Sequence, residues 1–241
     1  MIKKEVNWLY LYKYMSFEQF VSMVELRRLY LTKVSIWDDT YETIPIKKAS
    51  KEVLDRINED HPALHFKATE NLKNLFIDSY YAQSWTSTDE ESDAMWRIYS
   101  SGASGVRIKF DEKIIATSIK KELSDKYPKS KKSLESFDMN YQKYVICYKD
   151  KRSAFQHELE YRFSVFIDSL DMVLNRPIDL YEDEKPLEYP SVIYYAISIG
   201  KLEEVLLDPR APKYYEEMFM RYCVNRKFKA GIFSKSKLYT L

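Results

Sequence analysis

The chain has 241 residues, of which 45% are hydrophobic and 31% are charged, the composition of an ordinary soluble globular protein. Its 38 Lys and Arg residues against 37 Asp and Glu residues give a formal net charge of +1, which excludes a global field that would attract nucleic acid or an anionic membrane. No apolar run approaches the length of a membrane span, and no signal-peptide core follows residues 1–7. We therefore expect a cytoplasmic protein with no membrane partner.

The counts of aromatic residues, glycine and cysteine narrow the class of protein further. The chain contains 21 Tyr and 12 Phe residues but only 4 Gly residues. Such rings line binding pockets, and they also fill ordinary sheets. Cys147 and Cys223 are too far apart for a zinc motif or a disulfide framework, so we expect two buried thiols in a reducing compartment.

The first forty residues predict a strand, a helix, a strand and a loop. Residues 8–14 are aromatic and aliphatic with Lys13 as their only charge, and Ser16 can cap the helix that the following apolar spacing indicates. Residues 29–32 predict a second short strand. Residues 37–42 have neither helical nor strand periodicity, so we expect an ordered loop whose carboxylates bind a cation or a substrate hydroxyl, or only cap the turn.

The middle of the chain predicts two helical segments on either side of a strand. Residues 49–78 carry apolar residues spaced for two amphipathic helices. Residues 80–85 have strand character, and residues 89–99 predict a helix. We expect three side chains of that helix to face the interior: Met95, Trp96 and Tyr99.

The next segment predicts a turn, a strand and a charged excursion. Residues 100–105 hold two of the glycines but lack the spacing of either common phosphate-binding loop. Residues 106–110 alternate as a strand. Residues 120–143 are rich in lysine with interleaved acids, which favours a solvated helical excursion, with a phosphate-binding patch as the alternative.

The remaining strands and one long helix complete the predicted fold. Strands are expected at residues 144–148, 161–167, 191–199, 204–207 and 232–236, and a helix at residues 214–228. We therefore predict a single α+β domain over residues 1–241, in which short, mostly antiparallel strands form a split or strongly twisted sheet. The inserted helices are expected at approximately residues 49–78 and 111–137.

One charged stretch at the start of a strand indicates a possible site. Because side chains two apart on an extended backbone share a face, Glu158, Glu160 and Arg162 are expected to project together. The opposite, buried face would carry Leu159, Tyr161 and Phe163. Taken alone, the three charges predict either an exposed charged ladder or a functional site.

Four blocks of the sequence together resemble a known bacterial family. They are residues 11–16, residues 37–42, residues 95–99 followed by 105–110, and residues 158–162. Together they are similar to the family catalogued as domain of unknown function 2971. The chain departs from that family's pattern at Met15, Trp37, Thr40 and Phe155.

The order of the blocks is also similar to that of mono-ADP-ribosyltransferases, which cleave the nicotinamide glycosidic bond of NAD. That resemblance implies that Glu160 stabilises the oxocarbenium-like ribose and that Glu158 orients or deprotonates the acceptor. It also implies that NAD is a substrate rather than a tightly bound cofactor.

The same resemblance assigns substrate-binding roles to further residues. Ser84 and Thr86 would brace the strand or contact the ribose, and Lys13 or Arg162 would meet the pyrophosphate. Aromatic rings for stacking on nicotinamide or adenine would come from Tyr14, Tyr81 or Trp96. Asp39 and Glu42 of the loop are candidates for binding a substrate hydroxyl. For Arg162, an ion pair with Glu158 or Glu160 is an equal alternative.

Two other classes of function stay open. A metal-assisted hydrolase would use carboxylates as oxygen ligands for magnesium or calcium: Asp38, Asp39, Glu42, Glu158 and Glu160. A non-catalytic module of a toxin or phage-defence system would bind nucleotide or nucleic acid through the lysines of residues 120–132.

Overall fold

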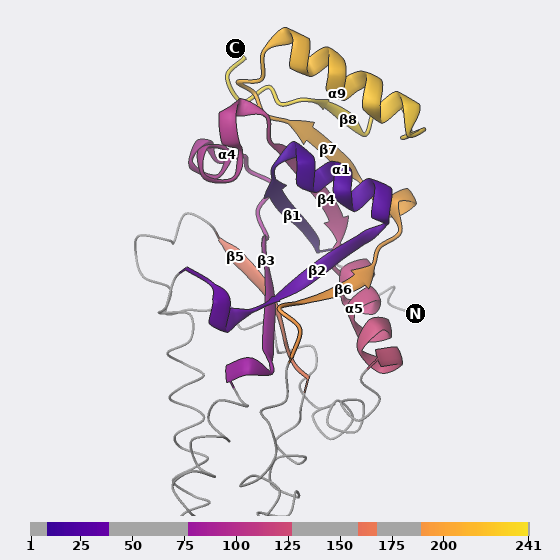
Figure 1. Cartoon of the computed structure of the whole chain (residues 1–241). Coiled ribbons are helices and arrows are strands. Elements are labelled where there is room, and N and C mark those ends of the chain that lie inside the picture. Colours follow the sequence, from indigo (N-terminus) through magenta and orange to yellow (C-terminus); the bar gives the residue numbers. More distant parts are fainter. Residues whose placement is uncertain (1–8, 39–76, 127–158, 168–188, 241) are drawn as a thin grey trace, which may run out of the picture.

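The computed structural model describes residues 9–38, 77–126, 159–167 and 189–240. These residues form an α+β fold with one mostly antiparallel, open sheet (Figure 1). Its strands are β1 (Tyr10–Met15), β2 (Arg28–Lys33), β3 (Tyr80–Thr86), β4 (Val106–Asp111), β5 (Glu160–Phe166), β6 (Val192–Ala196), β7 (Glu204–Leu207) and β8 (Phe233–Lys235). Its helices are α1 (Phe17–Leu26), α4 (Asp93–Tyr99), α5 (Glu112–Lys126) and α9 (Lys213–Asn225). Short 3₁₀ turns are η1 (Val34–Ile36), η3 (Ser101–Ala103) and η6 (Ile199–Lys201).

Local sequence signals set the ends of the helices. The Ser16 side chain accepts a hydrogen bond from the Gln19 backbone N–H, and the Gln19 side chain accepts one from the Ser16 N–H, so a capping box starts α1. Ser92 caps α4 in the same way through the Met95 N–H. Because that cap fixes the first turn, α4 begins at Asp93, four residues later than the apolar pattern predicts.

The sheet consists of two halves whose strands pair at a single residue pair among the described residues. Its strand order is β6-β2-β3-β1-β4-β7-β8, with β5 paired to the other edge of β3. The β1–β4 ladder covers six residue pairs and the β3–β5 ladder seven, whereas β1 and β3 pair only at Tyr12↔Thr86. The predicted split sheet is therefore present, with β6, β2, β3 and β5 in one half and β1, β4, β7 and β8 in the other.

One face of both halves is covered by helices and forms the main core. α1 and α9 pack against each other through ring contacts of Phe17 with Tyr215, Phe219 and Tyr222. α5 adds Ile115, Ile119 and Leu123 to the same core. In Figure 1, α1 and α9 lie over the β1–β4–β7 half, and α5 lies beside β6. The opposite face of β3 and β5 carries Ser84, Thr86, Glu160 and Arg162.

Two sequence predictions need correction. Tyr99, predicted to face the interior, is 41% exposed, because α4 is short and turns only Met95 and Trp96 toward the sheet. The extended backbone of β5 starts at Glu160, since Leu159 has a φ of 39° and an exposed side chain. The alternation that would place Glu158 on the face of Glu160 is therefore interrupted at Leu159.

Other expectations fall wholly or partly outside the described residues. These are the helices of residues 49–76, the strand of residues 144–148, the lysine segment beyond Lys126, Cys147 and most of the loop of residues 37–42. Cys223 is buried in the core as a free thiol, and burial raises its pKa to about 12. Among the described helices, none has both the length and the apolar character needed to span a bilayer.

Candidate functional site

The two halves of the sheet diverge at one edge of β3 and leave a fork there. β2 pairs with β3 at Ala82 and Tyr81, while β1 pairs with it at Thr86. Between these points, the edge of β3 has no strand partner among the described residues. Two side chains bridge the gap instead: Lys13 Nζ donates to the Ser84 carbonyl at 2.8 Å, and Gln83 Nε2 donates to the Tyr30 carbonyl at 2.9 Å.

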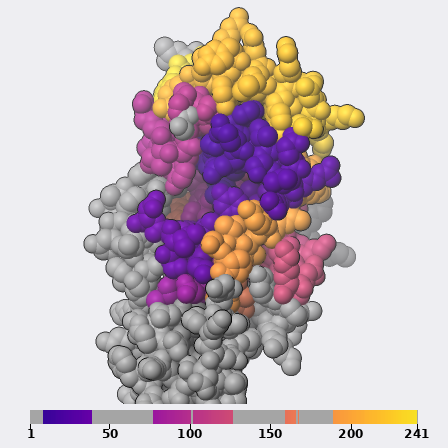
Figure 2. Space-filling view, viewed as in Figure 1, coloured from indigo at the N-terminus to yellow at the C-terminus, as the bar shows by residue number. Residues whose placement is uncertain are grey.

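The other edge of β3 places two charged candidates directly beside two hydroxyl candidates. Glu160 is opposite Thr86 and Arg162 is opposite Ser84 in the β3–β5 ladder. Since side chains directly opposite each other share a face of the sheet, all four lie on the face away from the main core. Figure 2 shows the molecular surface hollowed on this side, between α4 and the segment around β2.

Glu160 and Arg162 form a buried ion pair. Their side chains are 8% and 2% exposed, and the Arg162 Nη2 lies 2.7 Å from Glu160 Oε1. Arg162 Nε donates a second hydrogen bond to the same oxygen at 2.7 Å. The predicted ion pair between Arg162 and Glu160 is therefore present. Of the two predicted alternatives, the exposed charged ladder does not hold for these two residues, because both side chains lie in the interior.

Trp37 covers the ion pair from the segment that follows β2. The Arg162 guanidinium carbon lies 4.9 Å from the centroid of the Trp37 ring, within the range of a cation–π contact. The Trp37 indole N–H donates to Thr32 Oγ1 at 2.7 Å, which fixes the ring. Trp37, the first residue of the family block 37–42, thus contacts Arg162, the last residue of the block 158–162.

Lys13 reaches the fork from β1 in an apolar setting. Its ammonium lies 5.7 Å from the centroid of the Trp85 ring and donates to the Ser84 carbonyl. Burial lowers the pKa of Lys13 to about 8, although the negative charge of Glu160 acts in the opposite direction. The Lys13 ammonium therefore already serves as a bridge between β1 and β3.

The sequence reasoning missed a row of polar side chains that continues from the fork across β1 and β4. In register, Lys109 is opposite Tyr12, Tyr12 is opposite Thr86, and Thr86 is opposite Glu160. Beside that row, Arg107 is buried, lies 4.7 Å from the Tyr12 ring centroid and pairs with Glu204 at 2.9 Å. The alternation of residues 106–110 predicts that Arg107 and Lys109 share a face of their strand. It does not predict that β1, with Tyr12, lies beside that strand.

The predicted stacking residues are packed rather than open. Trp96 is fully buried, and its ring meets that of Tyr14 edge to face at 4.9 Å and 85°. Tyr14 is also buried, and its hydroxyl accepts a hydrogen bond from the Ser92 N–H at 3.3 Å. Tyr81 is fully buried in the main core and donates its hydroxyl to the Pro190 carbonyl. All three rings are therefore part of packed clusters, Tyr81 in the main core and Tyr14 with Trp96 in a separate one.

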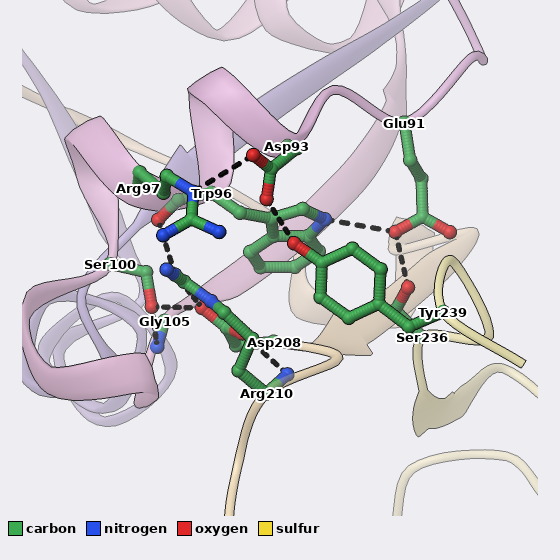
Figure 3. Close-up of polar contacts among 10 residues, drawn as sticks. All are labelled: Glu91, Asp93, Trp96, Arg97, Ser100, Gly105, Asp208, Arg210, Ser236 and Tyr239. Atoms are coloured by element: carbon green, nitrogen blue, oxygen red, sulfur yellow. Dashed lines mark hydrogen bonds and ion pairs between the residues drawn. The ribbon is translucent and has the colours of Figure 1, made fainter.

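A polar network fixes α4 against the C-terminal segment and so braces the β1 side of the fork (Figure 3). Glu91 Oε2 accepts hydrogen bonds from the Trp96 indole N–H, at 3.0 Å, and from the Ser236 hydroxyl. Asp93 accepts one from the Tyr239 hydroxyl. The indole N–H of the buried Trp96 is thereby satisfied by a carboxylate that also binds the C-terminal segment.

A second part of the same network surrounds Asp208, which is fully buried. Its carboxylate accepts hydrogen bonds from the Ser100 hydroxyl and from the backbone and guanidinium of Arg210. Ser100 Oγ in turn accepts the Gly105 N–H at 2.6 Å. A Cβ at Gly105 would overlap the Ser100 side chain, so the close approach itself requires glycine there.

Three candidates lie outside the described residues: Glu158, Asp39 and Glu42. Their roles stay predictions. Within the described residues, no group of three His, Cys, Asp or Glu side chains is placed to hold a metal ion. The structure thus places Ser84, Thr86, Glu160 and Arg162 on one face of the β3–β5 ladder. The Lys13 ammonium meets the Ser84 backbone carbonyl from the fork at the other edge of β3, and Tyr14 and Trp96 pack against each other beyond β1.

Comparison with known proteins gives one match. A family model described as "Protein of unknown function (DUF2971)" matches residues 95–163, which run from α4 to Phe163 in β5 and include Glu160 and Arg162. No curated protein and no solved structure matches the chain. Over residues 95–163 the chain therefore carries the pattern of the DUF2971 family, and the resemblance predicted from the sequence blocks is confirmed.

Proposed function

We propose that the protein cleaves the glycosidic bond between nicotinamide and ribose in NAD and passes the ADP-ribose to water or to an acceptor. One observation carries the proposal: Glu160, a buried carboxylate held by Arg162, lies opposite Thr86 on β3, the strand whose other edge forms the fork. The order of the blocks that contribute Lys13, Ser84 with Thr86, and Glu160 supports it, because it is similar to that of mono-ADP-ribosyltransferases.

The chemistry requires a fixed negative charge beside the ribose. When the C1′–N bond breaks, its electron pair leaves with nicotinamide, which becomes neutral, and positive charge develops at C1′ and the ring oxygen. A carboxylate that accepts a hydrogen bond from a ribose hydroxyl and lies near this charge stabilises the transition state more than the ground state. Glu160 would supply that carboxylate.

Arg162 has a positioning role in this proposal. Its two hydrogen bonds to Glu160 Oε1 hold the carboxylate in one orientation. Thr86, as the cross-strand neighbour of Glu160, is suited to orient the same ribose hydroxyl. The oxygen of water or of the acceptor would then bond to C1′ and lose its proton to a base, for which Glu158 stays the prediction.

The test follows free nicotinamide by chromatography after incubation with NAD. The wild-type chain is compared with Glu160→Gln, with Thr86→Val and with Glu217→Gln, whose carboxylate is exposed on α9. We expect Glu160→Gln to lose roughly 10²-fold or more in rate, Thr86→Val to lose less, and Glu217→Gln to match the wild type. Release without cell lysate would indicate a glycohydrolase, and release only with lysate a transferase.

Two results would contradict the proposal. If the wild type releases no nicotinamide with or without lysate, and NAD does not raise its melting temperature, the protein does not act on NAD. Equal rates for the wild type and Glu160→Gln would remove Glu160 from the reaction even if NAD were cleaved.

A further inference from the structure

A second polar and aromatic surface lies on β2 and β6, on the same face of the sheet as Glu160 but on other strands. These strands are paired over five residues, and β6 is the edge of the sheet among the described residues. One face of the pair is core, with Leu31, Ile193 and Tyr195 almost fully buried. The alternate side chains of β6 on the other face, Tyr194 and Ala196, are exposed. In Figure 2 the surfaces of β2 and β6 adjoin each other.

The open face carries a stack of a guanidinium and two rings. Tyr30 and Tyr194 are directly opposite in the β2–β6 register, and their ring centroids lie 6.1 Å apart at 71°. The Arg28 guanidinium carbon lies 3.8 Å from the Tyr194 ring centroid, and Tyr194 is 41% exposed. Arg28 faces Ala196 across the strands, and the small alanine leaves room for the guanidinium to lean over the neighbouring ring.

The charge on this surface is positive and not neutralised by the described residues. β2 and β6 contain no Asp or Glu. Arg27 and Arg28 are both exposed, and within the described ranges neither has a carboxylate in ion-pair contact. The third cation of this segment, Lys33, lies 3.7 Å from Asp78 and is therefore already paired.

These features together fit one class of ligand. Nucleobases stack on tyrosine rings and on arginine guanidinium planes, and arginine also binds phosphate. An acidic peptide would use the arginine but would leave the exposed Tyr194 ring without a partner. We propose that the Arg28–Tyr30–Tyr194 surface binds the base and phosphate of single-stranded nucleic acid. This proposal does not depend on NAD cleavage at Glu160.

The experiment measures binding of a fluorescently labelled single-stranded RNA oligonucleotide, and of its DNA counterpart, by anisotropy at several salt concentrations. Tyr194→Ala and Arg28→Ala remove the ring and the guanidinium, and Arg28→Lys keeps the charge without the planar group. Matched controls come from α9, where Tyr214→Ala and Arg221→Ala remove an exposed ring and an exposed cation. Lys120→Ala and Lys121→Ala test the lysines of α5 as the competing site.

We expect Tyr194→Ala and Arg28→Ala to weaken binding about tenfold or more, because stacking on one base contributes on this order. Arg28→Ala should also make the slope of log K against log salt less steep by roughly 0.7, since one phosphate contact is lost. Arg28→Lys should weaken binding while keeping the slope, and the α9 controls should bind like the wild type. A mononucleotide competitor should displace the oligonucleotide only at much higher concentration.

Three outcomes would overturn the proposal. The first is that the wild type does not bind either oligonucleotide at low salt. The second is that Tyr194→Ala, folded by circular dichroism, binds like the wild type. The third is that the α5 variants, and not the β2–β6 variants, lose binding.

Discussion

Arg162 Nε and Nη2 both donate to the same oxygen of Glu160, each at 2.7 Å, from a position two residues further along β5. Both side chains are buried, so the pair lies where a carboxylate without a cation would be costly. The arginine thus holds the carboxylate in one orientation, and its guanidinium also lies 4.9 Å from the centroid of the Trp37 ring.

Arg162→Leu should strongly destabilise the fold. Removing one partner of a buried ion pair leaves the other charge uncompensated, which costs about 3–5 kcal/mol. Urea unfolding at pH 7 measures this, with Lys126→Met as the control, because Lys126 is exposed and its pair with Glu122 should contribute under about 1 kcal/mol. If Arg162→Leu loses no more stability than Lys126→Met, the removal of Arg162 does not leave Glu160 as an unpaired buried charge.

Gly105→Ala should also destabilise the fold, for a steric reason. The new Cβ would overlap the Ser100 side chain, and Ser100 is held by Asp208 and the Gly105 N–H. We expect a lower melting temperature and no change for Gly200→Ala, where a Cβ meets no atom within 4 Å. The double variant Ser100→Gly/Gly105→Ala should not add the full cost of both changes, because the overlaps with the Ser100 Cβ and Oγ are removed and only the 2.9 Å approach to its Cα remains. Full additivity would contradict the steric explanation.

Lys13 should make stability rise with pH in the alkaline range. Burial lowers its pKa to about 8 in the folded chain, whereas an unfolded lysine has a pKa of about 10.4. Between these values the unfolded state binds more protons, so the free energy of unfolding increases with pH. Below the folded pKa both states are protonated, and the cost of burying the charge is constant. Between about pH 8 and 10, the free energy of unfolding of the wild type should therefore rise relative to that of Lys13→Met, as measured by urea unfolding. A difference between the two that stays constant over this range would contradict the shifted pKa.

Asp208 should make stability fall with acid. Burial acts to raise the pKa of its carboxyl, but the hydrogen bonds from Arg210 and Ser100 outweigh this and hold the pKa below its usual range. Its stabilising contribution is complete above the unfolded pKa and is lost as pH falls through the folded pKa. Asp208→Asn should cost about 2 kcal/mol at pH 7 and progressively less toward pH 3. An equal difference at both pH values would contradict an ionised Asp208.

The local elements of this fold could be predicted because their signals are local. The capping serine before α1, the alternation of β4 and β5 and the helix after Pro212 follow from two-residue and 3.6-residue periods in the sequence. The exposure of Tyr99 could not be predicted, because the spacing of apolar residues does not reveal where a short helix ends. The left-handed Leu159 carries no sequence signal that separates it from an extended residue.

The arrangement of the site could be predicted only in part. The order of the sequence blocks groups Lys13, Ser84, Thr86, Glu160 and Arg162. The fold places the last four on one face of the β3–β5 ladder, and brings the Lys13 ammonium to the Ser84 carbonyl at the other edge of β3. The fork itself depends on which residues of β1 and β2 meet one edge of β3, and such register is set by packing between distant segments. For the same reason, the cover of Trp37 over Arg162 and the place of Arg107 beside Tyr12 could not be derived from the sequence.

The role of Glu160 in NAD cleavage is tested most directly by the rate of nicotinamide release by Glu160→Gln, relative to the wild type and to Glu217→Gln. Both variants must first show the wild-type thermal shift with ADP-ribose, so that folding and binding are equal. We expect a loss of roughly 10²-fold or more for Glu160→Gln alone. A Glu160→Gln rate within about twofold of the wild type, at equal binding, would contradict a carboxylate that stabilises the transition state.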